Sequence, residues 1–379
     1  MVNRILFLVK STSPFKTQRN DLDYLISELI KKGHNVEIYD MKQKILMDVK
    51  NEIQESYELF PSWLYKGKLS LLLNFFVFIH FLKRKSGCYS IVQICYVREE
   101  FLLLPNLIKR LADRVYILVF GSDYNLRNPI KDHFTKLYSL ADKVFVTTGD
   151  AEKRMKGIIN EPSLDKKTFV LMTPQNHFEL YDGVAYEEKT HYKNLFGFDE
   201  NKKVILVGTN SSPNEQHELA IESLKFLDPS RYILVFSITN VFDEITEREQ
   251  SLANHIRSEL EGFELIILHG FLKYEEVRDL RFASDFFINV RKNDQMALSM
   301  IESNLAYNYV VTGEWLPYKC YSEDFKVIRV SEVAKIFEVI DSVSNMDENE
   351  LSYILVQNRQ QALDMYGKGL IDSWLLHYA

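Results

Sequence analysis

The feature that most constrains the fold is a regular alternation of short apolar runs and amphipathic segments in the second half of the chain. Apolar runs at 263–268, 285–290 and 308–313 have the length and composition of buried parallel strands. The segments 273–284 and 294–307 carry apolar residues among charges, which predicts two amphipathic helices. Strands that alternate with helices in this way indicate a parallel sheet and an α/β fold.

Polar residues gather where these predicted strands end, at 269–270, 291–295 and 313–318. In a doubly wound sheet, the carboxyl ends of the strands line the crevice in which ligands bind. We therefore expect binding residues at these three places.

The first half of the chain shows the same alternation. A strand is expected at 2–10, a helix at 21–34 and a second strand at 36–41, and Gly33 is the expected stop of the helix. A chain of 379 residues has room for two such domains. We expect a first domain at 1–195, a second at 196–350, and C-terminal helices at 351–379 that cross back to the first.

The composition excludes several classes of protein. A net charge of −7 argues against nucleic-acid binding. The cysteines Cys88, Cys95 and Cys320 form no metal or disulfide pattern, which fits a reducing cytoplasm. The sequence contains no run of 18 apolar residues, so no membrane-spanning helix is predicted.

One basic and apolar segment, 61–85, stands apart in this acidic chain. Between residues 61 and 115 there are nine Lys or Arg and three Asp or Glu. The pattern fits a helix that lies on the inner face of an anionic cytoplasmic membrane. It fits equally a buried core helix with charged ends.

A loop rich in small polar residues follows the predicted strand 203–207. Gly208, Thr209 and Asn210 can present backbone N–H groups to a phosphate, although such residues are also common in ordinary turns. His217, at the start of the next helix, either faces the ligand or is structural.

Asp294 and Glu302 are two acids separated by seven residues, and they follow Gly270-Phe271-Leu272, a helix and a strand in that order. With these motifs the stretch 269–318 resembles the donor half of the GT-B nucleotide-sugar glycosyltransferases, particularly the family-4-like group (glycosyl transferases group 1). The resemblance implies two Rossmann-like domains facing across a cleft, with a C-terminal helix that packs back on the first domain.

The resemblance also implies roles. Glu302 would bind the ribose hydroxyls and Asp294 a hydroxyl of the donor sugar, while Arg291 or Lys292 would neutralise the leaving diphosphate. The free N–H groups of a helix that opens at 295–297 would meet the diphosphate. The expected donor-binding residues are Gly208, Thr209, Asn210, His217, Gly270, Phe271, Leu272, Arg291, Lys292, Gln295, Met296, Ala297 and Glu302.

This sequence departs from the family pattern at two points. Asp294 replaces the usual Glu, and Gln295-Met296-Ala297 replaces a Gly-rich tetrapeptide. No Asp-x-Asp motif stands out, so we expect transfer without a metal. On the acceptor side we expect Ser13, Gly121 and Ser122.

The resemblance implies a hexosyltransferase that uses a UDP-, GDP- or TDP-linked sugar and no further cofactor. Its acceptor would be lipid-linked or a glycan in bacterial surface polysaccharide biosynthesis. Asp294 and Asp123 are the catalytic candidates, although Asp123 is equally suited to capping a turn. Two alternatives stay open: a non-catalytic GT-B-like subunit that binds glycan or protein, and a sugar-nucleotide epimerase of the same fold.

Overall fold

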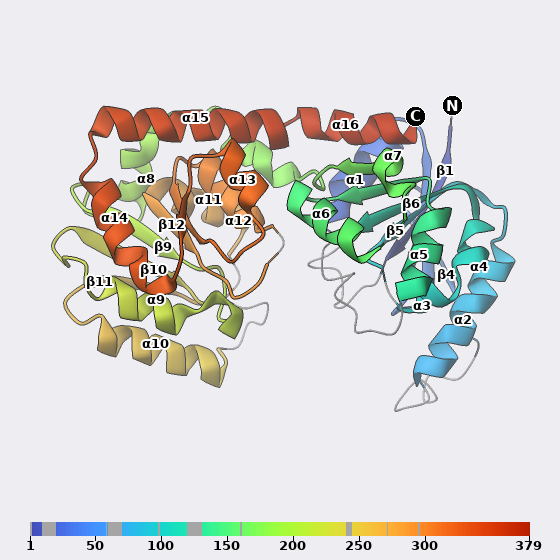
Figure 1. Cartoon of the computed structure of the whole chain (residues 1–379), viewed down its shortest axis with the longest axis horizontal. Helices are drawn as coiled ribbons and strands as arrows, with labels where there is room; N and C mark the ends of the chain where they lie inside the picture. Colours follow the sequence, from blue (N-terminus) through green and yellow to red (C-terminus); the bar gives the residue numbers. More distant parts are fainter. Residues whose placement is uncertain are drawn as a thin grey trace. The chain divides into compact units, whose positions relative to one another are not determined.

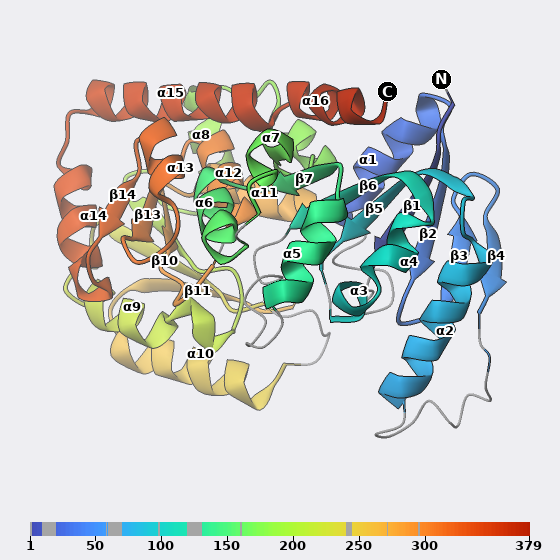
Figure 2. The same ribbon diagram turned by 45° about the vertical axis from the view of Figure 1, so that its right-hand side comes forward.

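The computed structural model describes residues 2–9, 20–57, 59, 70–97, 99–119, 131–159, 161–239, 245–270, 272–294 and 296–379. Its contacts divide the chain into two compact units (Figures 1 and 2). Unit 1 consists of residues 1–175 and 369–379, and unit 2 consists of residues 176–368.

The boundary drawn from the sequence at residue 195 differs from this division. Residues 176–195 belong to unit 2. The reason lies in two side chains of this segment, because Lys189 donates to the carbonyl of Ser284 and Lys193 forms an ion pair with Asp285.

Unit 1 is built on a sheet that, in the described part of the chain, has the strand order β4-β3-β2-β1-β5-β6-β7-β8. The strands from β2 to β8 in this order are parallel, whereas β3 and β4 form an antiparallel extension next to β2. The strands are β1 (Arg4–Val9), β2 (Asn35–Asp40), β3 (Ile45–Asp48), β4 (Ile53–Ser56), β5 (Tyr89–Cys95), β6 (Ala112–Val119), β7 (Lys143–Val146) and β8 (Thr168–Val170).

Helices join these strands, and the expected stop of the first helix is confirmed. Gly33 follows α1 with φ +89°, a conformation that glycine adopts without steric cost. The helices of unit 1 are α1 (Asn20–Lys31), α2 (Ser70–Arg84), α3 (Glu99–Leu103), α4 (Pro105–Lys109), α5 (Lys131–Leu140), α6 (Gly149–Ile158), α7 (Leu164–Lys167) and α16 (Gly369–Tyr378).

Helix α2 forms most of the segment 61–85, for which the sequence allowed either a core helix or a membrane-surface helix. Its inner face packs in the core. Phe81 stacks on Tyr39 with ring centroids 3.8 Å apart. Glu55 of β4 pairs with Arg84 (3.0 Å), so the helix lies against the antiparallel strands (Figure 2). Its outer face carries Leu72 and Phe76, which are 53% and 49% exposed. Residues 60–69 lie outside the described ranges.

Helix α16 belongs to unit 1 although it is distant in sequence from the rest of the unit. The indole of Trp374 is fully buried and donates to the carbonyl of Met172 (2.6 Å). The hydroxyl of Tyr378 donates to Gln93 on the central strand β5 (2.9 Å). The expected return of a C-terminal helix to the first domain is therefore confirmed for 369–379, whereas residues 351–368, which were expected to return as well, belong to unit 2.

Unit 2 is built on a fully parallel sheet with the order β11-β10-β9-β12-β13-β14 in the described part of the chain. Figure 1 shows α9 and α10 on one side of this sheet and α11 and α12 on the other. The strands are β9 (Lys203–Val207), β10 (Tyr232–Ser237), β11 (Glu264–Leu268), β12 (Phe286–Asn289), β13 (Tyr309–Gly313) and β14 (Ile328–Val330).

The order of these strands reverses between β9 and β12, because β10 follows on one side of β9 and β13 on the other side of β12. Such a switch point is where ligands bind in open α/β sheets. The helical segments of unit 2 are η3 (Asn176–Tyr181), η4 (Tyr186–Glu188), α8 (Lys189–Leu195), η5 (Pro213–Glu215), α9 (His217–Leu224), α10 (Glu247–Glu259), α11 (Tyr274–Ala283), α12 (Leu298–Leu305), α13 (Lys319–Asp324), η6 (Val333–Lys335), α14 (Ile336–Ser344) and α15 (Glu348–Tyr366).

Candidate functional site

The loops that follow β9 and β12 meet at the switch point of unit 2. The N–H of Gly208 donates to the carbonyl of Ile288 (3.1 Å), and the N–H of Lys292 donates to the carbonyl of Asn214 (2.8 Å). The side-chain amide of Asn214 donates to the carbonyl of Asn293 (2.9 Å). These bonds fix the two loops to each other at the carboxyl ends of the strands.

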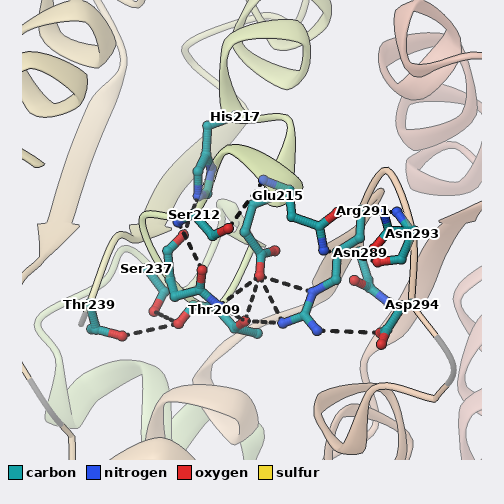
Figure 3. Close-up of polar contacts among 12 residues, drawn as sticks. Thr209, Ser212, Glu215, His217, Ser237, Thr239, Asn289, Arg291, Asn293 and Asp294 are labelled. Atoms are coloured by element: carbon teal, nitrogen blue, oxygen red, sulfur yellow. Dashed lines mark hydrogen bonds and ion pairs between the residues drawn. The ribbon is translucent and has the colours of Figure 1, made fainter. Parts of the chain in front are cut away.

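Arg291 lies at the centre of an ionic network between these loops (Figure 3). Its Nε donates to Glu215 Oε1 (2.9 Å), and its Nη2 donates to Thr209 Oγ1 (2.6 Å). Its Nη1 lies 3.3 Å from Asp294 Oδ2, which also accepts from the hydroxyl of Tyr318 (2.5 Å). Burial works to lower the pKa of Arg291, but Glu215 and Asp294 raise it more. The charge of Arg291 is thus matched by two carboxylates of the protein itself.

His217 supports the loop after β9. The side chain is fully buried, and its Nε2 is hydrogen-bonded to the carbonyl of Asn210 (2.7 Å). Gly208 has φ +67°, and a Cβ there would lie 2.4 Å from the His217 ring. Burial lowers the pKa of His217, which favours the neutral ring.

A cavity of about 380 Å³ opens beside these loops, and its described lining residues belong to unit 2. The ends of β9 and β10, helix α11 and the start of α12 contribute the lining. Its position at the switch point makes it the candidate binding site.

Glu302, on α12, contributes a carboxylate to this wall and is only 7% exposed. Its Oε1 is hydrogen-bonded to Nε2 of His177 (2.8 Å), and its Oε2 pairs with Arg281 Nη2 (2.7 Å). Burial alone would raise the pKa of Glu302, but Arg281 and His177 outweigh it and lower the pKa to about 2. The carboxylate is therefore ionised and held in place by two side chains.

The first turn of α12 also faces the cavity. Ala297 is its N-cap and makes no side-chain cap, and the turn contains no acidic residue. Because the first N–H groups of a helix have no partner within it, they suit an anionic group. Ser299 Oγ and Arg281 Nε, both on lining residues, are buried without a hydrogen-bond partner among the described residues.

The structure brings together part of the predicted donor set. Those that line the cavity are Gly208, Thr209, Leu272, Arg291, Met296, Ala297 and Glu302. Asp294 is not among the described lining residues; it is bonded to Tyr318 and Arg291, which lines the cavity, and Lys292 is exposed. Asn210 braces Glu215 through its amide (2.9 Å), and Gly270 follows β11 with φ +75°.

Other predicted residues lie outside the described ranges. They are Phe271 and Gln295 on the donor side, and Ser13, Gly121, Ser122 and Asp123 on the acceptor side.

Sequence reasoning did not identify Arg281 as a site residue, because it sits in a helix rich in charged residues. It also gave no role to Tyr274 or Glu215 and no partner to His177. The carboxylate partner of His177 is 125 residues away, and that of Arg291 is Glu215, 76 residues away. No local signal in the sequence indicates such pairs.

Two searches of the described residues gave negative results. No group of three or more His, Cys, Asp or Glu side chains within the described ranges could hold a metal ion. No helix in the same part of the chain has the length and apolar character needed to cross a membrane.

Comparison of the whole fold with solved structures gives matches over the full chain. A glycosyltransferase from Rickettsia africae has a TM-score of 0.72 at 14% identity and covers 100% of this chain and 97% of its own. HepE of Anabaena, in complex with UDP, has a TM-score of 0.71 at 12% identity with 99% of each chain covered. Sucrose-phosphate synthase of Thermosynechococcus elongatus has a TM-score of 0.72 at 11% identity, covering 99% of this chain and 98% of its own.

The chain has the GT-B fold. Two Rossmann-like units, a parallel sheet in the second and a C-terminal helix that returns to the first are the elements of this GT-B architecture. No family model and no curated protein sequence matches the chain. The expectation of a GT-B fold is confirmed by the structural matches.

Proposed function

We propose that this GT-B protein is a glycosyltransferase that uses a nucleoside-diphosphate sugar. The observation that carries the proposal is the cavity at the switch point of unit 2, which has the ionised Glu302 in its wall and the start of α12 beside it. HepE, which shares the fold, was solved with UDP and with UDP-glucose. The cavity and the likeness to HepE both support a nucleotide-sugar donor at this place in the fold.

The arrangement suggests a division of roles within the cavity. Glu302 has both oxygens paired, but each carboxylate oxygen has a further lone pair with which it can accept from a ribose hydroxyl. The N–H groups of residues 298–299 and the hydroxyl of Ser299 suit the diphosphate. Asp294, oriented by Tyr318 and Arg291, is assigned to a hydroxyl of the donor sugar. Arg291, which is held in place by Glu215 and Asp294, contributes to binding the leaving diphosphate.

For the reaction type, the compartment and the acceptor, we propose what the sequence indicated. The reaction is a hexosyl transfer without a metal ion, in the cytoplasm, to a lipid-linked or glycan acceptor of bacterial surface polysaccharide biosynthesis. Asp123 is the candidate acceptor base. A lipid-linked acceptor fits the outer face of α2, where the exposed Leu72 and Phe76 precede Lys83, a combination suited to an anionic membrane.

Binding of a nucleotide panel to the full chain tests the donor assignment. UDP, GDP, TDP and their glucose conjugates would be compared by calorimetry, in EDTA and in magnesium. We expect one nucleotide series to bind in both buffers, and to raise the unfolding midpoint because only the folded state binds it. Absence of binding by every nucleotide would refute the proposal, and binding only in magnesium would refute metal independence.

Membrane contact has its own test. The chain would be mixed with vesicles of anionic phospholipid and with vesicles of neutral phospholipid, and sedimented. We expect binding to the anionic vesicles that weakens with salt, and a loss of binding in Leu72→Ser/Phe76→Ser. Equal recovery of the variant and the wild type with the vesicles would exclude α2 as the contact.

A second candidate function is a non-catalytic GT-B-like subunit. The observation that favours it is that Arg281 and Arg291, both in the cavity wall, are each paired with protein carboxylates. Release of UDP from a bound UDP-sugar, in the presence of membrane lipid extract, distinguishes the two: an enzyme turns over and a binding subunit does not.

A further inference from the structure

Two aromatic rings form a parallel stack at one side of the cavity. Tyr274, the first residue of α11, lines the cavity and is 39% exposed. Its ring lies on that of His177, with centroids 4.3 Å apart and an angle of 8° between the planes. Because His177 is buried, the stack fixes the orientation of the tyrosine ring at the cavity wall.

The same histidine connects this stack to the carboxylate of the site. Its Nε2 is hydrogen-bonded to Glu302 Oε1 (2.8 Å), and Arg281 holds the other carboxylate oxygen (2.7 Å). These contacts connect the start of α11 to η3, then to α12, and then back to α11. The residues in this order are Tyr274, His177, Glu302 and Arg281. A ligand that reaches Glu302 has the face of Tyr274 one imidazole ring away.

We propose that Tyr274 is the stacking face for the nucleobase of the donor and that His177 is the positioning residue that holds both Tyr274 and Glu302. This inference rests on the proposed function, in which Glu302 accepts the ribose hydroxyls. In a nucleoside the base is bonded to C1′, next to the carbon that bears the 2′-hydroxyl. Tyr274 lines the same cavity as the ribose-binding carboxylate, one imidazole ring away from it, which suits it to contact the attached base.

The position of the diphosphate separates the base from the donor sugar. The sugar is joined to the ribose through two phosphates, and the N–H groups suited to phosphate lie at Ala297–Ser299, at the start of α12. Tyr274 belongs to a different element, α11, and is linked to Glu302 through His177. The stack consequently serves the base end of the donor.

The stack also predicts what kind of selectivity the site has. Every base offers a π-face, so stacking on Tyr274 adds affinity without distinguishing among bases. His177 has its Nε2 committed to Glu302 and its ring face committed to Tyr274. Discrimination among uracil, guanine and thymine must then come from other groups, so truncating Tyr274 weakens all the nucleotides that bind.

The test compares Tyr274→Ala, Tyr274→Phe and the wild type by calorimetry with UDP, UDP-glucose and ribose 5-phosphate. Stacking of a base on an aromatic side chain is worth about 1–3 kcal/mol, so Tyr274→Ala should weaken UDP and UDP-glucose roughly 5- to 150-fold. Ribose 5-phosphate has no base, so the wild type and Tyr274→Ala should bind it with the same affinity. Tyr274→Phe keeps the ring and should bind UDP like the wild type. Tyr353→Ala, at an exposed tyrosine of α15 outside the cavity wall, is the matched control.

The outcomes separate this inference from the proposed function. If the wild type binds UDP and Tyr274→Ala binds it equally well, the stacking assignment is wrong and the donor assignment stands. If only UDP-glucose binding is weakened, the ring contacts the sugar and the assignment to the base is overturned. If the wild type binds no nucleotide, the proposed function itself fails.

His177 is tested by the coupling between two substitutions. If His177 positions both neighbours, His177→Ala should weaken UDP more than Tyr274→Ala does, and the double variant should lose less than the sum of the two. Additive losses, with unfolding midpoints unchanged among the variants, would overturn the positioning role.

Discussion

Replacement of Glu302 by alanine should destabilise unit 2 as well as weaken the donor site. The carboxylate is the ion-pair partner of Arg281, which is only 4% exposed to solvent. Removal of one partner from a buried pair leaves an uncompensated charge and typically costs about 3–5 kcal/mol. A residue that only bound the ligand could be replaced without loss of stability, and the Arg281 contact shows that Glu302 is also structural.

The pKa of Glu302 expresses the strength of the same contacts with Arg281 and His177. The folded protein holds it at about 2, against 4.5 for an unperturbed glutamate. A difference of about 2.5 in pKa corresponds to about 3 kcal/mol at neutral pH, since each pKa unit is worth about 1.4 kcal/mol. The group is buried, so screening by solvent takes little from this figure. We therefore expect Glu302→Ala to lose about 3 kcal/mol, the lower end of the range for a broken buried pair.

The sign of the pH dependence follows from the same comparison. The folded-state pKa lies below the unfolded one, so the contribution of Glu302 is fully present above pH 4.5 and is lost as the pH falls towards 2. The stability difference between the wild type and Glu302→Ala should therefore narrow in acid.

Thermal and urea unfolding, followed by circular dichroism at pH 7 and pH 4, measure these effects. For a unit of the size of 176–368, about 3 kcal/mol corresponds to a fall in the midpoint of roughly 6–12 °C. Glu222→Ala, which removes an exposed pair with Lys225, should change the stability by less than about 1 kcal/mol. The double variant Arg281→Met/Glu302→Leu should recover much of the loss, because it leaves no unpaired charge. A Glu302→Ala protein that unfolds like the wild type at pH 7 would refute the reasoning.

Three further predictions concern residues that support the two units. Burial lowers the pKa of Lys189 to about 7 whereas the unfolded lysine titrates near 10.5, so the wild type should gain stability from pH 7 to pH 9 in thermal melts, and Lys189→Met should gain less. Gly208→Ala should lower the unfolding midpoint and the affinity for nucleotide together, because the new Cβ meets His217 at 2.4 Å; normal values for both would contradict this. Trp374→Ala should cost about 3–5 kcal/mol through the loss of a buried ring and of its bond to Met172, and urea unfolding that matches the wild type would show that α16 is dispensable.

Much of the fold could be predicted because its strands are buried on both faces. Strands such as β12 and β13 are continuous apolar runs between polar loops, and their period and length identify them without further information. The hairpin of β3 and β4 was not predicted. Its strands are only four residues each, β4 has a single apolar residue, and most of the side chains are partly buried or exposed at the edge of the sheet.

The site was predictable only where it depends on backbone chemistry. Gly208 and Ala297 could be placed at the cavity because strand ends and helix starts converge at a switch point. The pairing of Glu302 with Arg281 and His177 could not be predicted, because it joins α12 to α11 and to η3 through side chains distant in sequence. A charged residue in an amphipathic helix is ordinarily on its solvent face, whereas Arg281 and Glu302 are both buried.

The membership of α16 in unit 1 has a consequence for the order in which the chain can fold on the ribosome. Residues 1–175 are synthesised first, yet the ring of Trp374 and the hydroxyl of Tyr378 that complete their interior come from 369–379. At typical elongation rates of about 5–20 residues per second, translation of 176–368 takes roughly 10–40 s. During that interval the positions that Trp374 and Tyr378 occupy in unit 1 are unfilled, so the packing of the first unit is completed only after the last helix of the chain has been synthesised.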